Sequence, residues 1–381
     1  MRLSSSALAI GLAFLVLAAS DRVERKAFVK RGDHFGEGRL EEVAGVRILH
    51  LHGRPFELGY EQGALLKAEL AKRDQEDRDY ARRNARQFTR LPAWLGRPLL
   101  GPILAQRARE LGRDLDPESR EELRGMAQGS GLSSSKLLAL DLIFGLAQLH
   151  DGLQFALGPP ASKPKELWHG FSSRLGEADQ AELAAYQAVI FYHPEGRLKF
   201  VSIGLIGAPG VVTGMNEAGI TISWSGGPGA IATAQTARAV LEQARTLDQA
   251  AGILQARVPG PSGAILIGSG SEAQALLLKA SGRGWDREEM KDGRLGSGAC
   301  WPEAGPIGPR GLKPALDLAG AGCGGEPQVA RLGVVYDPTG NRVWIALDRP
   351  AAGQEQWAEV DFASETLREP EAFPGTLNSN P

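Results

Sequence analysis

Histidine, serine and cysteine side chains are the groups of this sequence that could carry out nucleophilic or metal chemistry. None of them lies in a G-x-S-x-G, H-E-x-x-H or phosphate-loop motif. These are the local patterns typical of serine hydrolases, zinc peptidases and nucleotide-binding enzymes. The sequence therefore predicts no standard catalytic site, and any chemistry must come from residues that the fold brings together.

His50 and His52 form the most metal-like pattern. They lie in the segment 46–52, which alternates and is rich in branched residues, so it predicts a strand with both rings on one face. A stable site needs further ligands, and none follows nearby in the sequence. We interpret the pair as polar positions of an edge strand, and we predict neither a metal nor another cofactor.

The hydrophobic pattern predicts a mixture of helices and hairpin-linked strands. Apolar residues at helical spacing begin at Pro55 and predict a helix that continues to about Thr89. Asp116 followed by Pro117 is typical of a helix start. Residues 282–328 are rich in glycine and proline, which predicts a long loop on the surface. Strands are predicted at 186–193, 198–206, 211–213, 220–224, 264–268, 275–279, 331–336 and 342–347, and further helices at 233–257.

Three segments, taken in order, resemble one protein family. They are RPFELGYEQG at 54–63, ELRGMAQGSGLS at 122–133 and GMNEAGI at 214–220. Together with the hairpin at 334–344, they resemble the acyl-coenzyme A:isopenicillin N acyltransferase-like family of N-terminal-nucleophile hydrolases. The resemblance extends from about Val46 to Phe362. It implies an α+β fold, a four-layer αββα sandwich of two antiparallel sheets between helical layers.

The resemblance also implies a mechanism whose nucleophile is missing here. In the family, the precursor cleaves itself before a cysteine, whose thiolate attacks an amide or thioester while the freed α-amino group acts as the base. The corresponding stretch of this chain is DGLQFAL at 151–157. Gly152, or Leu153 if the alignment moves by one residue, takes the place of the cysteine. Neither side chain has a nucleophilic atom.

The residues that support the nucleophile in the family are replaced as well. The family pattern His-Gly-Arg-Asn-x-Asp corresponds to HGFSSR at 169–174, and an active-site asparagine corresponds to Ala264. Asn216 alone is retained, either as a candidate oxyanion donor or as a turn residue. An oxyanion donor by itself contributes on the order of 10²–10³ in rate, which does not make a useful enzyme.

Two functional hypotheses follow. The first is a catalytically degenerate exported protein on this scaffold, with a small amide, acyl or peptide-like ligand as its expected partner in the cleft. The alternative is an active amide hydrolase or acyltransferase with a relocated serine nucleophile. Ser172 and Ser173 are the candidates for that nucleophile, and His169 is the candidate base. The sequence does not indicate whether the protein is a monomer or an oligomer.

The N-terminus has the layout of a secretory signal peptide. Arg2 precedes the apolar run 7–17, and Ala18, Ala19 and Ser20 offer small residues for cleavage. We therefore expect a periplasmic or extracellular protein, anchored to the membrane only if the signal is retained. The expected plan is a signal peptide at 1–20, a linker at 21–45, one domain at 46–362 and a tail at 363–381, with no stable membrane span after signal cleavage.

Charge argues against a nucleic-acid partner, because 43 basic and 45 acidic residues give a formal charge of −2. Arg78, Arg82, Arg86 and Arg90 recur at every fourth position. This stripe could meet an anionic partner or a membrane surface, but we expect a solvated face balanced by neighbouring acids.

The two cysteines are Cys300 and Cys323. After export they could form a disulfide worth on the order of 3 kcal/mol, or they could remain two unrelated thiols. Their spacing leaves both alternatives open.

Overall fold

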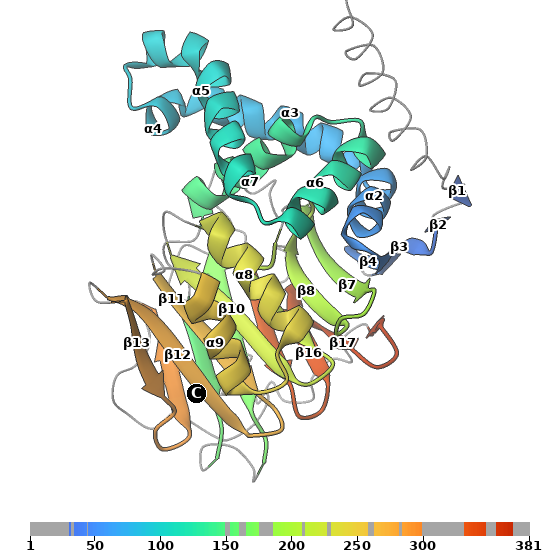
Figure 1. The fold of residues 1–381 in the computed structure, drawn as a ribbon, viewed down its shortest axis with the longest axis vertical. Helices are drawn as coiled ribbons and strands as arrows, with labels where there is room; N and C mark the ends of the chain where they lie inside the picture. Colours follow the sequence, from blue (N-terminus) through green and yellow to red (C-terminus); the bar gives the residue numbers. More distant parts are fainter. Residues whose placement is uncertain are drawn as a thin grey trace, which may run out of the picture.

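A computed structural model describes most of the chain between residues 30 and 368, and Figure 1 shows its arrangement. The expected signal peptide at 1–20, Gly152 and both cysteines lie outside the described residues. The described ranges are 30–31, 34–43, 45–148, 153–159, 165–174, 186–207, 210–226, 230–257, 263–281, 284–298, 331–347 and 356–368.

Two β-sheets lie face to face, and helices cover the larger one (Figure 1). In spatial order, the larger sheet contains β1 (Lys30–Arg31), β2 (His34–Phe35), β3 (Gly38–Val43), β4 (Val46–Gly53), β7 (Gln187–Pro194), β8 (Phe200–Leu205), β9 (Thr213–Asn216), β10 (Ile220–Gly226), β11 (Gly263–Ser269), β12 (Gln274–Ser281) and β13 (Gly284–Glu289). The smaller sheet contains β14 (Arg294–Ser297), β5 (Leu153–Leu157), β6 (Trp168–Arg174), β15 (Arg331–Asp337), β16 (Arg342–Leu347), β17 (Gln356–Asp361) and β18 (Thr366–Arg368).

The helices fall into two groups along the chain. Between β4 and β5 come α2 (Pro55–Leu65), α3 (Lys67–Arg83), α4 (Ala85–Thr89), α5 (Ala93–Asp114), α6 (Pro117–Ser130) and α7 (Ser134–Gln148). Between β10 and β11 come α8 (Ala230–Gln243) and α9 (Leu247–Arg257), which pack on the larger sheet. None of the described helices is both long enough and apolar enough to cross a bilayer.

This architecture confirms the predicted α+β class, with one correction to the predicted pairing. Strands β4 and β7 are parallel, with Leu49 opposite Ile190. The other described strand pairs are antiparallel. The parallel pair arises because the chain leaves β4 through a long crossover before it returns. The described part of that crossover contains α2 to α7 and then β5 and β6 of the smaller sheet, and so long a connection permits parallel pairing. Of the four expected layers, the described residues show both sheets and the helices on the larger one.

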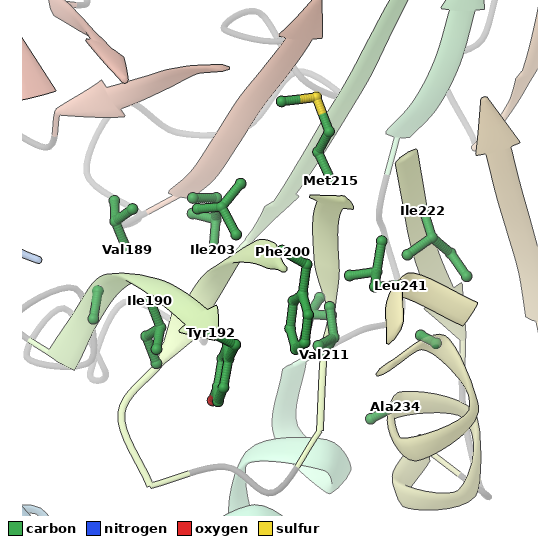
Figure 2. Close-up of a cluster of buried hydrophobic side chains, with 14 of the residues drawn as sticks. Val189, Ile190, Tyr192, Phe200, Ile203, Val211, Met215, Ile222, Ala234 and Leu241 are labelled. Atoms are coloured by element: carbon green, nitrogen blue, oxygen red, sulfur yellow. The ribbon is translucent and has the colours of Figure 1, made fainter. Parts of the chain in front are cut away.

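The central strands of the larger sheet are buried on both faces, so β7 and β8 are apolar at most successive positions rather than at alternate ones. In β7, Phe191 packs against Phe362 beside the smaller sheet, whereas its neighbour Tyr192 lies under Arg238 of α8. Figure 2 shows the apolar cluster in which Phe200 and Ile222 of the sheet lie near Leu241 of α8. The central strands and α8 therefore share one core.

Three segments differ from the sequence expectations. The expected linker at 21–45 contains β1, β2 and β3, which pair in succession onto β4. The expected tail after residue 362 contains β18, which pairs with β17. Within the expected surface loop at 282–328, the structure has β13 and β14, which lie at the edges of the two sheets. These strands are largely polar or glycine-containing and partly exposed, so they lack the apolar signal of central strands.

The long helix expected from Pro55 to Thr89 is divided into α2, α3 and α4, with breaks at Leu66 and Asn84. The helix start at Asp116 is confirmed, because its carboxylate accepts a hydrogen bond of 2.9 Å from the Ser119 N–H. That helix, α6, ends where Gly131 takes a left-handed conformation.

Helices α2 and α6 pack with their backbones almost in contact, because each has two glycines four residues apart. A β-carbon added to Gly59 would lie 1.9 Å from the Glu122 carbonyl oxygen, and one added to Gly125 would lie 2.0 Å from the Phe56 carbonyl oxygen. Gly63 and Gly129 meet backbone at 2.3 Å in the same way. A side chain at any of these positions would force the two helices apart.

We therefore expect Gly125→Ala to reduce the free energy of unfolding by about 3 kcal/mol, because the added methyl group overlaps the opposite backbone. Gly101→Ala is the matched control. It lies in helix α5 with no heavy atom within 4 Å of its added β-carbon, so we expect unchanged stability or a gain of up to about 1 kcal/mol. Urea denaturation of both variants measures the difference, and equal effects would contradict the close contact.

Candidate functional site

The strand in which the sequence resemblance places the expected cysteine position lies at the centre of the molecule. Leu153 is the first residue of β5, is fully buried and lies opposite Ser172 of β6. Strand β5 faces β10 and β11 of the larger sheet. The candidate site is therefore the part of the intersheet space between β5, β6, β10 and β11.

Gln154, the next residue, joins the two sheets. Its amide nitrogen donates to the Ser225 hydroxyl at 2.7 Å and to the Ala264 carbonyl at 3.0 Å. Its amide oxygen accepts from the Ser223 hydroxyl at 2.9 Å and from the Leu266 N–H at 3.2 Å. Both amide hydrogens and both lone pairs of this buried side chain are therefore used within the protein.

His169 lies beside this amide on β6 and is also fully buried. Its Nδ1 is 2.7 Å from the Thr221 hydroxyl, and its Nε2 is 2.7 Å from the Ser223 hydroxyl. Burial lowers the pKa of His169 to about 3, so the ring is neutral at ordinary pH. A neutral imidazole carries one donor and one acceptor, and both are in use.

Hydrogen-bond accounting fixes the direction of this chain. We assign donation from the Thr221 hydroxyl to Nδ1 of His169, from Nε2–H to Ser223, and from the Ser223 hydroxyl to the oxygen of Gln154. The reverse direction would leave the Thr221 hydrogen without an acceptor among the described residues. His169 is thus a donor to Ser223 rather than the base that would activate it.

The structure does not bring His169 to the two serines expected as nucleophiles. Successive side chains of a strand point to opposite faces, so Ser172 lies on the face of β6 opposite His169. Ser173 shares the face of His169 but lies four residues away, or about 13 Å along the strand. Both serines are buried. The expected nucleophile–base contact is therefore not formed.

Asn216 is fully buried at the turn between β9 and β10. Its amide nitrogen donates to the carbonyls of Leu241 and Ala244 at 2.9 and 2.8 Å. Its oxygen accepts from the N–H groups of Ala218 and Ile220. Both amide hydrogens are thus occupied at the end of helix α8, which favours the turn interpretation over that of an oxyanion donor.

Sequence analysis missed Gln154, Thr221, Ser223 and Ser225. The signal was present, because the last three residues alternate along β10 within an otherwise apolar strand. Alternate positions share one face, so a polar face was predictable there. The contacts of this polar face could not be predicted, because its partners come from β5 and β6, more than fifty positions away in the sequence.

His50 does find the additional metal-type ligands that the sequence did not indicate. His50 Nδ1 and His193 Nε2 lie 2.9 and 3.1 Å from the same oxygen of Glu365, and the three ligand atoms lie within 4.8 Å of one another. Arg39 is 2.9 Å from Nε2 of His50, and Lys199 is 3.1 Å from the other oxygen of Glu365. Three nitrogen groups therefore surround the carboxylate, and Arg39 lies on the far side of the His50 ring.

The basic neighbours make this group a poor fit for a metal ion. A guanidinium only donates hydrogen bonds, so Arg39 makes Nε2 of His50 an acceptor and leaves the proton on Nδ1, which points at Glu365. A metal at Nδ1 would have to displace that proton. Burial alone would raise the pKa of Glu365, but the hydrogen bonds from His193 and His50 hold it well below its usual range. We interpret the cluster as an ionic link between β4, β7 and the β17–β18 turn.

A second buried charged group joins the helices. Arg238 of α8 forms ion pairs with Glu122 of α6 and with Glu242, the latter at 2.8 Å. Its guanidinium lies 4.8 Å from the centre of the Tyr192 ring. Burial raises the pKa of Glu122, and Arg238 opposes that shift. These paired charges connect α6 to α8 on the side of the larger sheet away from the candidate site.

Comparison with known proteins yields no family model that matches this chain and no curated protein that matches it. Solved structures give partial likenesses. An N-acylethanolamine-hydrolyzing acid amidase ortholog from Caenorhabditis elegans matches at 13% identity and a TM-score of 0.40, over 57% of this chain and 99% of that one. A variant of conjugated bile acid hydrolase from Clostridium perfringens matches at 10% and 0.38, over 60% and 100%. Penicillin V acylase from Agrobacterium tumefaciens matches at 10% and 0.29, over 59% and 91%. With TM-scores below 0.5, these likenesses assign no role to any residue of this chain.

The buried neutral state of His169 predicts how stability depends on pH. In the unfolded chain this histidine takes up a proton near pH 6.5, whereas the folded protein resists it down to about pH 3. Stability is therefore lost as the pH falls below 6.5, by about 2 kcal/mol between pH 7 and pH 5. His169→Gln should lack this contribution.

Urea denaturation of both proteins at pH 7 and pH 5 measures the difference in pH dependence. Glu61, whose pKa burial raises to about 7, titrates in the same window with the opposite sign, but it is present in both proteins and cancels. An identical pH dependence in the two proteins would show that His169 is not held neutral.

Proposed function

We propose that this chain is a catalytically inactive, exported protein built on an amide-hydrolase-like scaffold. The observation that carries the proposal is the direction of the hydrogen-bond chain, which starts at Thr221 and ends on the amide oxygen of Gln154. A catalytic chain ends on a base that accepts the nucleophile's proton. Here the hydroxyl of Ser223 gives its hydrogen to an amide oxygen, which is too weak a base to activate it.

The residues around this network support the same proposal. The position expected for a cysteine nucleophile is Gly152 or Leu153 in the sequence, and Leu153 is a buried apolar residue. The amide hydrogens of Asn216 are bonded to the backbone, so stabilising an oxyanion would cost those bonds. A small amide, acyl or peptide-like ligand at this centre would likewise have to replace protein–protein hydrogen bonds.

Intact mass after expression in an exporting host tests the loss of self-processing. We expect one chain, shortened only at its N-terminus after a residue near Ser20, because neither Gly152 nor Leu153 can attack a peptide bond. The unexported chain with the N-terminal 20 residues deleted is the control for the mass of the mature protein. Two fragments with a new terminus near residue 152 would refute the proposal.

The alternative of a relocated serine is tested with a fluorophosphonate probe, which labels activated serines, and with fluorogenic acyl-amide and acyl-thioester substrates. We expect no labelling and no turnover above a heat-denatured sample, because His169 donates to Ser223 and contacts neither Ser172 nor Ser173. Ser172→Ala, Ser173→Ala and Ser223→Ala are compared with the unsubstituted chain. Labelling or turnover that one of these variants abolishes would establish the active alternative at that residue.

A further inference from the structure

Residues 80–109 form a helical arm that consists of the end of α3, all of α4 and most of α5. In Figure 1 the helices of this arm lie at the end of the molecule opposite the sheets. The arm contains seven arginines and no lysine, aspartate or glutamate. It is thus a concentrated positive region in a chain whose formal net charge is −2.

Most of this charge is not neutralised by neighbouring side chains. Arg78, before the arm, forms an ion pair with Asp74 at 2.6 Å, and Arg82 forms one with Asp79 at 3.3 Å. The solvated-face interpretation therefore holds for the first half of the arginine stripe. Beyond it, the arginines of the arm that are exposed and form no ion pair with any described residue are Arg83, Arg86, Arg90, Arg97 and Arg109.

The same arm carries the most exposed apolar side chains. Trp94 is 77% exposed and Leu99 is 39% exposed, and they are the two large exposed hydrophobic residues in the described part of the chain. The arm has a small core of its own, in which the buried side chains include Tyr80, Phe88 and Leu100. Trp94 lies outside that core, so packing within the arm does not explain why a tryptophan occupies this position.

We propose that this arm docks on the surface of a lipid bilayer that contains anionic phospholipids. Arginine donates paired hydrogen bonds to phosphate oxygens, and tryptophan favours the headgroup region, where its ring meets the acyl chains and its N–H stays hydrated. Arg86, Arg90 and Arg97 meet the headgroups, and Trp94 inserts at the interface. The charges along the arm are typical of a helix that lies on a membrane rather than one that spans it.

The exposed tryptophan distinguishes this partner from a soluble polyanion. A polyphosphate or nucleic-acid backbone would be attracted by the arginines alone, with strong salt dependence and no use for Leu99. A bilayer uses both features, because its surface is anionic and its interior is apolar. The proposal therefore requires both the charge and Trp94 to contribute to binding.

Cosedimentation of the mature chain with vesicles tests the proposal. Vesicles of phosphatidylcholine alone are compared with vesicles that contain about one-third phosphatidylglycerol. We expect binding to the second and at least about tenfold less to the first. Arg86→Gln, Arg90→Gln and Arg97→Gln combined should weaken binding at least about tenfold, and Trp94→Ala about fivefold. The tryptophan emission should shift to the blue on binding, and Trp94→Ala should remove that shift.

The matched control combines Arg245→Gln and Arg257→Gln, which remove exposed charges on the α8–α9 side and should leave binding unchanged. The thermal unfolding midpoint of every variant is compared with that of the unsubstituted chain, so that loss of folding is recognised. Equal binding to both vesicle types, no binding to either, or binding unaffected by Trp94→Ala would overturn the proposal. Capture by heparin but not by vesicles would overturn it in favour of a soluble polyanion.

Discussion

Burial of a single amide, that of Gln154, sets the relation between the two sheets. An amide held away from water needs partners for both hydrogens and both lone pairs, and each unmade bond costs about 1–3 kcal/mol. These partners come from β10 and β11, through Ser223, Ser225 and the backbone of Ala264 and Leu266. Apolar packing alone tolerates small sliding of one sheet over the other. Four directed hydrogen bonds do not, so β5 is held in one position against the larger sheet.

The same requirement determines how the other polar groups at the centre of the molecule are hydrogen-bonded. Because Gln154 needs a donor for its oxygen, it takes the hydrogen of Ser223, and Ser223 then accepts from His169. A buried, neutral histidine that already donates through one nitrogen and accepts through the other has no lone pair left for a nucleophile. The hydrogen bonds that satisfy these buried polar groups therefore use the same atoms that activation of a nucleophile would require.

Local signals predicted the local structure well, whereas long-range contacts were beyond them. The strand at β4, the cap at Asp116 and the hairpin of β15 and β16 follow from spacing and turn chemistry within a few residues. The parallel pair of β4 and β7 depends on more than 130 residues of intervening chain. The network around His169 has the same origin, because its parts lie in four strands. The glycines of α2 and α6 were visible as parts of family-like motifs, but their purpose appears only when the two backbones meet.

The distribution of charge gives the proposed membrane contact a direction. The whole chain carries −2 and the arm carries +7, so the remaining residues together carry −9. An anionic bilayer would therefore attract the arm and repel the rest of the chain, within a screening distance of about 10 Å at ordinary salt. The arm lies at the end of the molecule opposite the sheets (Figure 1). Attraction and repulsion then favour the same orientation, with Trp94 toward the membrane and the sheets held away from it.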